Sequence, residues 1–177
     1  MKTIVTDIPD YKTFLHGGRT LEIGYPWLTF GAIMALEKIL YDSNGQFKIL
    51  EIGMGGSTAF FITRCKKLIS LEHDYTWFKR VEQTLGLIEG LCMSVPRLIG
   101  EIDTYLDKVF DLVLVDGGAN WKERQQLLDA SHSKVKKGGW LIIDNYERVK
   151  FDYTGWDVYT FDMFRYSGRG TKLCRKL

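Results

Sequence analysis

The stretch KILEIGMGGSTAFF, Lys48–Phe61, contains the pattern that decides the fold. Its first half is an apolar run typical of a buried strand, and its second half favours a helix. Three glycines, Gly53, Gly55 and Gly56, separate the two halves. Glycines at a strand-to-helix turn let the main chain pass close to another group, which is most often a nucleotide. The stretch therefore predicts the first strand, loop and helix of a nucleotide-binding unit.

Strand-like and helix-like segments alternate from Phe47 to Asn145. The apolar runs are FKILEIG, KLISLE, CMSVPRLIG, FDLVLVDGG and GGWLIIDN. Because these runs are apolar at nearly every position, they predict strands buried on both faces, in a parallel sheet between two layers of helices. The segments DYTWFKRVEQTLGLIEG and NWKERQQLLDASHSKVKK have helical length, and Asp74 and Asn120 are predicted to cap them.

The two ends of the chain complete the predicted architecture. Residues 1–45 predict an irregular lead-in and a helix within YPWLTFGAIMALEKIL, in the same domain as residues 46–177. The segments GWDVYTFDMF and GRGTKLCRKL predict an antiparallel hairpin at the sheet edge. The predicted fold is α/β: a Rossmann-like three-layer sandwich with a mostly parallel, seven-stranded sheet and an antiparallel C-terminal hairpin.

The composition indicates the compartment and the kinds of partner. A net charge of +2 gives no reason to expect a nucleic-acid or membrane partner. The three cysteines are far apart, which argues against a zinc site or a disulfide framework and suits the cytoplasm. No apolar run approaches the length that spans a bilayer, and Asp7 interrupts the amino terminus before a signal peptide could form. A homodimer or a partner subunit is left open.

The glycine loop reads E-x-G-x-G-G-S from Glu51 to Ser57. Glu51 stands two residues before the first glycine, where an acid can reach the amino group of an amino-acid moiety. The NAD-binding fingerprint would require a small residue at position 58, and Thr58 is there instead. The loop therefore favours a nucleotide cofactor other than NAD.

Two further acids follow predicted strands. Glu72 closes the second strand, 19 residues after Gly53, and a carboxylate there can accept hydrogen bonds from both ribose hydroxyls. Glu101 closes the run LIGEID, where it would meet an adenine edge. The alternative is that these are tight turns with solvated acids.

The segments LEIGMGGST, LISLEHD, FDLVLVDGG and KKGGWLIIDN together resemble the class I S-adenosylmethionine-dependent methyltransferases, from about Lys48 to the end of the chain. YPWLTFGAIMAL, GGST and LEHDYTWF are similar to a group of short bacterial and phage methyltransferase-like proteins. The resemblance implies that S-adenosylmethionine is the cofactor. The residues that it implies are Glu51, Gly53, Gly55, Gly56 and Ser57 at the methionine portion, Glu72 at the ribose, Glu101 on the adenine side, and Asp116 near the methyl group. His73, which follows Glu72, is expected to stack near the adenine or to face solvent.

The kind of acceptor follows from motifs that the chain lacks. There is no NPPY or DPPY tetrapeptide, which disfavours methylation of exocyclic amines in DNA bases, and no Pro-Cys pair, which disfavours attack on cytosine by a cysteine. We therefore expect a small-molecule acceptor, with methylation at oxygen. The sulfonium already activates the methyl group, so the protein has to align a nucleophile and manage its proton.

A metal site is a further expectation. Asp116 ends the fourth strand and Asp144 and Asn145 end the fifth, and such oxygen ligands suit Mg²⁺ or Ca²⁺. This is similar to the catechol and caffeoyl-CoA type O-methyltransferases, which also carry a lysine base three residues after the first metal Asp. Here that position is Ala119, and Lys122 is the nearest lysine, so Lys122 is the candidate base. Alternatively, Asp116 serves the cofactor and the Asp-Asn pair merely ends a strand.

Two other functions are left open. One is an NAD-linked or nucleotide-sugar-linked enzyme, against which Thr58 and the terminal hairpin speak. The other is a non-catalytic S-adenosylmethionine-binding partner or regulatory protein, because only about 45 residues are available to cover an acceptor.

Overall fold

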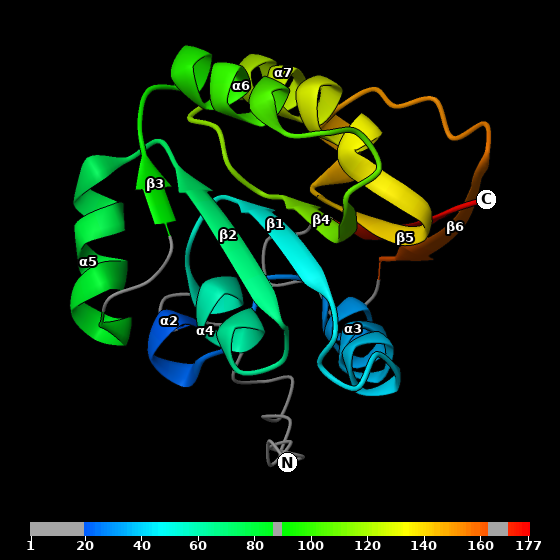
Figure 1. Ribbon diagram of the computed structural model, residues 1–177, viewed down its shortest axis with the longest axis horizontal. Helices are drawn as coiled ribbons and strands as arrows, with labels where there is room; N and C mark the ends of the chain where they lie inside the picture. Colours follow the sequence, from blue (N-terminus) through cyan, green and yellow to red (C-terminus); the bar gives the residue numbers. More distant parts are fainter. Residues whose placement is uncertain (1–19, 87–89, 163–169) are drawn as a thin grey trace.

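The computed structural model describes residues 20–86, 90–162 and 170–177. Its centre is a seven-stranded sheet with the order β3-β2-β1-β4-β5-β7-β6 (Figure 1). The parallel strands are β1 (Lys48–Ile52), β2 (Lys67–Glu72), β3 (Gly90–Cys92), β4 (Phe110–Val115) and β5 (Val135–Asp144). The antiparallel strands are β6 (Trp156–Phe161) and β7 (Thr171–Lys176), with β7 between β5 and β6. The predicted fold is confirmed, including the C-terminal hairpin.

Helices cover both faces of the sheet. Figure 1 shows α6 (Val95–Thr104) and α7 (Trp121–Ser131) on one face of the sheet and α3 (Phe30–Asp42) on the other. The elements α2 (Thr20–Ile23) and α4 (Gly56–Ile62) lie on the same side as α3, and α5 (Tyr75–Leu85) lies beside β3 at the edge. Short 3₁₀ turns, η1 (His132–Lys134) and η2 (Tyr146–Arg148), flank β5. The result is the expected three-layer arrangement.

The central strands β1 and β4 are mostly apolar because helices pack against both faces of the sheet there. In β4 all six residues are buried. Leu112 belongs to the core that includes helices α3 and α4, whereas Val113, its neighbour, belongs to the core beneath α6 and α7. Alternation of side chains across a strand therefore fills two cores at once.

Two local predictions hold and two are wrong. The side chains of Asp74 and Asn120 cap α5 and α7, as predicted. Asp74 Oδ1 accepts from the Trp77 amide at 3.0 Å, and Asn120 Oδ1 accepts from the Glu123 amide at 3.1 Å. The run CMSVPRLIG is not one strand, because β3 ends at Cys92 and the remainder starts helix α6. Strand β5 starts at Val135, three residues before the predicted run.

Parts of the predicted lead-in and of the predicted hairpin lie outside the residues that the structure describes. The first 19 residues of the lead-in, and the parts of the hairpin segments within residues 163–169, lie outside them. Within the described ranges, no helix combines the length and apolar character that a membrane span requires.

Candidate functional site

A cleft of about 410 Å³ lies at the carboxyl ends of β1, β2 and β4. Sheet order reverses between β1 and β4, and ligands of open α/β sheets bind at such a reversal. The volume is in the range of ligand-binding clefts. The cleft is lined by Thr20, Trp27, Gly53, Met54, Gly55, Gly56, Ser57, Glu72, His73, Asp74, Trp77, Asp116, Gly117 and Arg124.

Two of the loop glycines are required by contacts within the protein. Gly53 has φ of 95°, and a Cβ there would lie 2.6 Å from the Gly117 amide nitrogen. This close approach lets the Gly117 amide donate to the Ile52 carbonyl at 2.7 Å, which joins the ends of β4 and β1. A Cβ at Gly56 would collide with the main-chain carbonyl of Tyr25. The glycine pattern therefore has a structural cause in addition to any cofactor.

Glu72 forms one wall of the cleft and is held by main-chain amides. Its side chain is 3% exposed. Oε2 accepts from the Met54 amide at 2.9 Å, and Oε1 accepts from the amides of His73 at 2.7 Å and Asp74 at 2.8 Å. The His73 Nδ1 lies 2.9 Å from the same Oε1. These contacts fix the carboxylate against the glycine loop.

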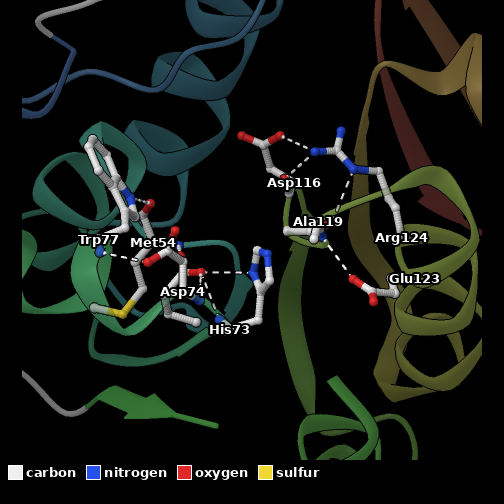
Figure 2. A network of polar contacts seen from close by, with 10 residues as sticks. Met54, His73, Asp74, Trp77, Asp116, Ala119, Glu123 and Arg124 are labelled. Carbon is white, nitrogen blue, oxygen red and sulfur yellow. Dashed lines mark hydrogen bonds and ion pairs between the residues drawn. The ribbon is translucent and has the colours of Figure 1, made fainter. Parts of the chain in front are cut away.

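Trp77 is a cleft residue that sequence reasoning missed. Its indole Nε1 donates to the Met54 carbonyl at 2.6 Å, so the ring is held at the loop (Figure 2). Its place follows from the cap at Asp74, which sets where α5 begins and hence which side chains of the first turn face the loop. The run LEHDYTWF contained this signal.

Glu51 lies beneath the loop and does not line the cleft. The hydroxyls of Thr58 and Ser70 donate to its Oε2 at 2.7 and 2.6 Å. The Thr58 hydroxyl also accepts from the Gly55 amide at 2.9 Å, so Thr58 connects the buried acid to the loop. Burial raises the pKa of Glu51 to about 7. The expectation that its carboxylate meets a cofactor directly does not fit this position.

The opposite wall of the cleft is built from Asp116 and Arg124. Asp116 follows β4, and its side chain is 28% exposed. Arg124 reaches from α7, and its Nη2 lies 3.1 Å from Asp116 Oδ1 (Figure 2). Burial raises the pKa of the Asp116 carboxyl above its ordinary value, although the Arg124 charge opposes this.

Asp144, at the end of β5, lies just behind this pair. Its Oδ1 accepts from the Thr171 hydroxyl at 3.0 Å, and its Oδ2 accepts from the side-chain amide of Asn145. Burial, followed by the nearby charge of Asp116, raises the pKa of Asp144 well above its ordinary value. Both strand-end acids lie near one guanidinium, that of Arg124, which is 3.1 Å from Asp116 Oδ1 and 3.9 Å from Asp144 Oδ2.

The residues present do not fit the predicted metal. A guanidinium nitrogen of Arg124, Nη1, lies 3.9 Å from Asp144 Oδ2 while Nη2 contacts Asp116, so an internal cation lies between the two acids. The third predicted ligand, Asn145, donates its side-chain amide to Asp144 Oδ2.

Two predicted site residues lie elsewhere. Glu101 is on helix α6, where its carboxylate accepts from the Tyr105 hydroxyl at 2.8 Å, because the segment that contains it is helical rather than a strand end. Lys122 is exposed in the first turn of α7 and does not line the cleft, so it is not placed to act as a base. The cation of α7 that reaches the cleft is Arg124, two residues later.

Solved structures share this fold. An O-methyltransferase from Bacillus cereus in complex with SAH is 14% identical, with a TM-score of 0.67, covering 98% of this chain and 94% of that chain. The O-methyltransferase TomG from Streptomyces achromogenes, involved in tomaymycin synthesis and in complex with SAM, is 15% identical, with a TM-score of 0.61, covering 97% and 92%. An rRNA methylase from Streptococcus thermophilus is 13% identical, with a TM-score of 0.59, covering 82% and 96%. The fold alone therefore does not select the acceptor.

Sequence comparison identifies the family. None of the curated proteins matches this chain significantly. The family model described as a methyltransferase domain matches residues 50–146, which include the glycine loop, Glu72, Asp116 and the end of β5. The chain therefore belongs to this methyltransferase-domain family and is an S-adenosylmethionine-dependent methyltransferase of class I.

Proposed function

We propose that the protein binds S-adenosylmethionine in the cleft and methylates a hydroxyl of a small-molecule acceptor, with Asp116 as proton acceptor. The observation that carries the proposal is that one cleft contains both Glu72, from the end of β2, and Asp116, from the end of β4. The first is suited to a ribose and the second to a reacting hydroxyl.

Glu72 supports the cofactor half of the proposal. An ionised carboxylate has about four acceptor positions, and Oε2 uses one of its two for the Met54 amide. The remaining position is available to a ribose hydroxyl. In this arrangement Gly53, Gly55 and Ser57 border the methionine portion, and His73 with Trp77 borders the adenine side.

Asp116 supports the chemical half. When bound, S-adenosylmethionine supplies a methyl group on a positively charged sulfur. As the acceptor oxygen forms its bond to the methyl carbon and the carbon–sulfur bond breaks, the hydroxyl proton passes to the Asp116 carboxylate. Burial raises the pKa of Asp116, and a base is more effective as its pKa approaches the working pH.

The charges around the cleft support a small acceptor. The lining contains the acids Glu72, Asp74 and Asp116, against the single arginine Arg124 among the described residues. A nucleic acid needs lysines and arginines at its phosphates, and the net charge of the chain is only +2. The acidic lining would repel a phosphate backbone.

Transfer of a labelled methyl group from S-adenosylmethionine tests the proposal. The acceptors are a low-molecular-mass filtrate of a cell extract, a set of phenols, catechols and hydroxy acids, a set of amines, and total RNA. We expect an alkali-stable, ether-type methyl product from a small molecule, and no such product with Asp116→Asn. Labelling of RNA or of amines alone would contradict the proposal. Cofactor binding without transfer to any fraction would favour a non-catalytic binding protein.

A further inference from the structure

All three guanidinium nitrogens of Arg124 contact oxygen atoms on the Asp116 side of the cleft. Nε donates to the Gly117 carbonyl at 3.1 Å, and Nη1 donates to the Asp144 carbonyl at 3.2 Å. Nη2 donates to the Asp116 carbonyl and lies 3.1 Å from Asp116 Oδ1. One side chain therefore joins the ends of β4 and β5 and neutralises an acid on the cleft wall.

Arg124 is also buried, because it lies on the face of α7 that packs against the protein. Its side chain is 10% exposed, and it lies on the buried face of α7 with Leu127, Leu128 and Ser131. Its guanidinium carbon lies 5.3 Å from the centre of the Trp121 ring. A planar guanidinium with five donors suits such a cluster of carbonyls and carboxylates, whereas a lysine ammonium has three donors and no fixed plane.

A divalent cation held by Asp116 and Asp144 would have to lie close to the Arg124 guanidinium. Mg²⁺ and Ca²⁺ bind oxygen ligands at about 2.0–2.6 Å. The guanidinium already lies 3.1 Å from Asp116 Oδ1 and 3.9 Å from Asp144 Oδ2, so an ion shared by the two acids would meet its positive charge. The remaining predicted ligand, Asn145, donates its side-chain amide to Asp144. Arg124 thus places a positive charge near both acids, as the ion would.

We propose that Arg124 is a positioning residue that replaces the divalent cation of the metal-dependent O-methyltransferases that the sequence resembles. It holds the Asp116 carboxylate toward the acceptor and lets two acids lie together without a metal. The inference goes beyond the proposed function, and its test requires no acceptor. Its failure and the failure of the proposed reaction are therefore separate results.

The test measures what happens to cations when the arginine charge is removed. Tb³⁺, an oxygen-binding analogue of Ca²⁺, is titrated into the cofactor-free protein, and its luminescence is excited through tryptophan, for which Trp121 is close to the site. The variants are Arg124→Ala, Arg124→Lys, the double variant Arg124→Ala with Asp144→Asn, and the control Arg97→Ala. Arg97 is exposed on α6, which packs beside α7. Circular dichroism verifies folding, and Arg124→Gln replaces Arg124→Ala if that variant does not fold.

The expected result is a gain of binding, which a merely structural role would not produce. Arg124→Ala should bind Tb³⁺ about tenfold more tightly, or better, than the wild type, with Ca²⁺ competing, because a unit charge at contact distance has been removed. Arg124→Lys and Arg97→Ala should behave as the wild type, and the double variant should lose the gain. Equal affinity in the wild type and Arg124→Ala, or a gain that survives Asp144→Asn, would overturn the inference.

Discussion

The carboxylate of Glu72 accepts a hydrogen bond of 2.9 Å from the main-chain amide of Met54. This bond connects the end of β2 to the glycine loop that follows β1, so the acid that faces the cleft also shapes its loop. The same bond also orients the Glu72 carboxylate, so that the side chain is in place before a cofactor binds. Pre-organisation of this kind reduces the free energy lost on ordering the site.

Glu72→Ala should weaken the binding of S-adenosylmethionine by about 1–3 kcal/mol, because the charged hydrogen bond to a ribose hydroxyl is lost. Isothermal titration calorimetry measures the change in dissociation constant. Glu82→Ala is the control, since Glu82 contacts Lys79 on the outer part of α5 and does not line the cleft. Unchanged affinity in a folded Glu72→Ala protein would remove Glu72 from the ribose role.

Gly56→Ala should destabilise the protein by about 1–3 kcal/mol or more, because its Cβ would meet main-chain carbonyls that cannot rotate away. Urea unfolding measures the free energy. Gly100→Ala is the matched control: Gly100 lies within α6 and a Cβ there would meet nothing within 4 Å. This control should be neutral, or more stable by up to about 1 kcal/mol, from helix propensity. Equal effects at both positions would show that the close approach at Gly56 is not limiting.

Glu51 makes the stability of the protein depend on pH. Its folded-state pKa is raised to about 7 from 4.5, chiefly by burial, so the folded state holds a proton that the unfolded state releases. The favourable contribution is complete below the unfolded pKa and is lost as the pH rises through the folded pKa. Across this window the free energy of unfolding should fall by roughly 3 kcal/mol from this group.

Glu51→Gln tests this dependence because glutamine keeps the shape and does not titrate. Urea unfolding of both proteins is measured at about pH 5 and about pH 8.5. The variant should gain stability relative to the wild type as the pH rises. A difference that stays constant with pH would mean that Glu51 titrates alike in the folded and unfolded states.

Asp116→Asn should lower turnover by roughly 10²–10⁴-fold, the usual contribution of a general base. The affinity for S-adenosylmethionine should change much less. In the wild type, turnover should rise with pH through an apparent pKa above that of an ordinary carboxyl, which belongs to Asp116 and Asp144 together. Full turnover in Asp116→Asn, once an acceptor is known, would exclude Asp116 as the base.

The order of strands and helices could be predicted from the sequence because the central strands β1 and β4 are apolar runs that end at glycines or before helix caps. The same rule failed at CMSVPRLIG, where apolar content concealed a helix start. Pro96 lies in the first turn of α6, and Val95, Leu98 and Ile102 are its buried residues, at spacings of three and four. Reading that spacing would have moved Glu101 from a strand end onto a helix.

The site was predicted only in part, because tertiary contacts decide which side chains meet. The placement of Glu72, Asp116 and Asp144 at one edge of the sheet could be predicted, because parallel strands have their carboxyl ends at the same edge. Arg124 was missed although it shares helical spacing with Leu127, Leu128 and Ser131, a pattern that indicates the buried face. What the pattern does not specify is that the buried arginine reaches back to the ends of β4 and β5.

Calorimetric titration of S-adenosylmethionine into cofactor-stripped wild-type protein, repeated with NAD, measures which cofactor the cleft binds. We expect binding of S-adenosylmethionine at micromolar concentration and no binding of NAD. Binding of NAD with equal affinity, or of neither ligand by a folded protein, would contradict it.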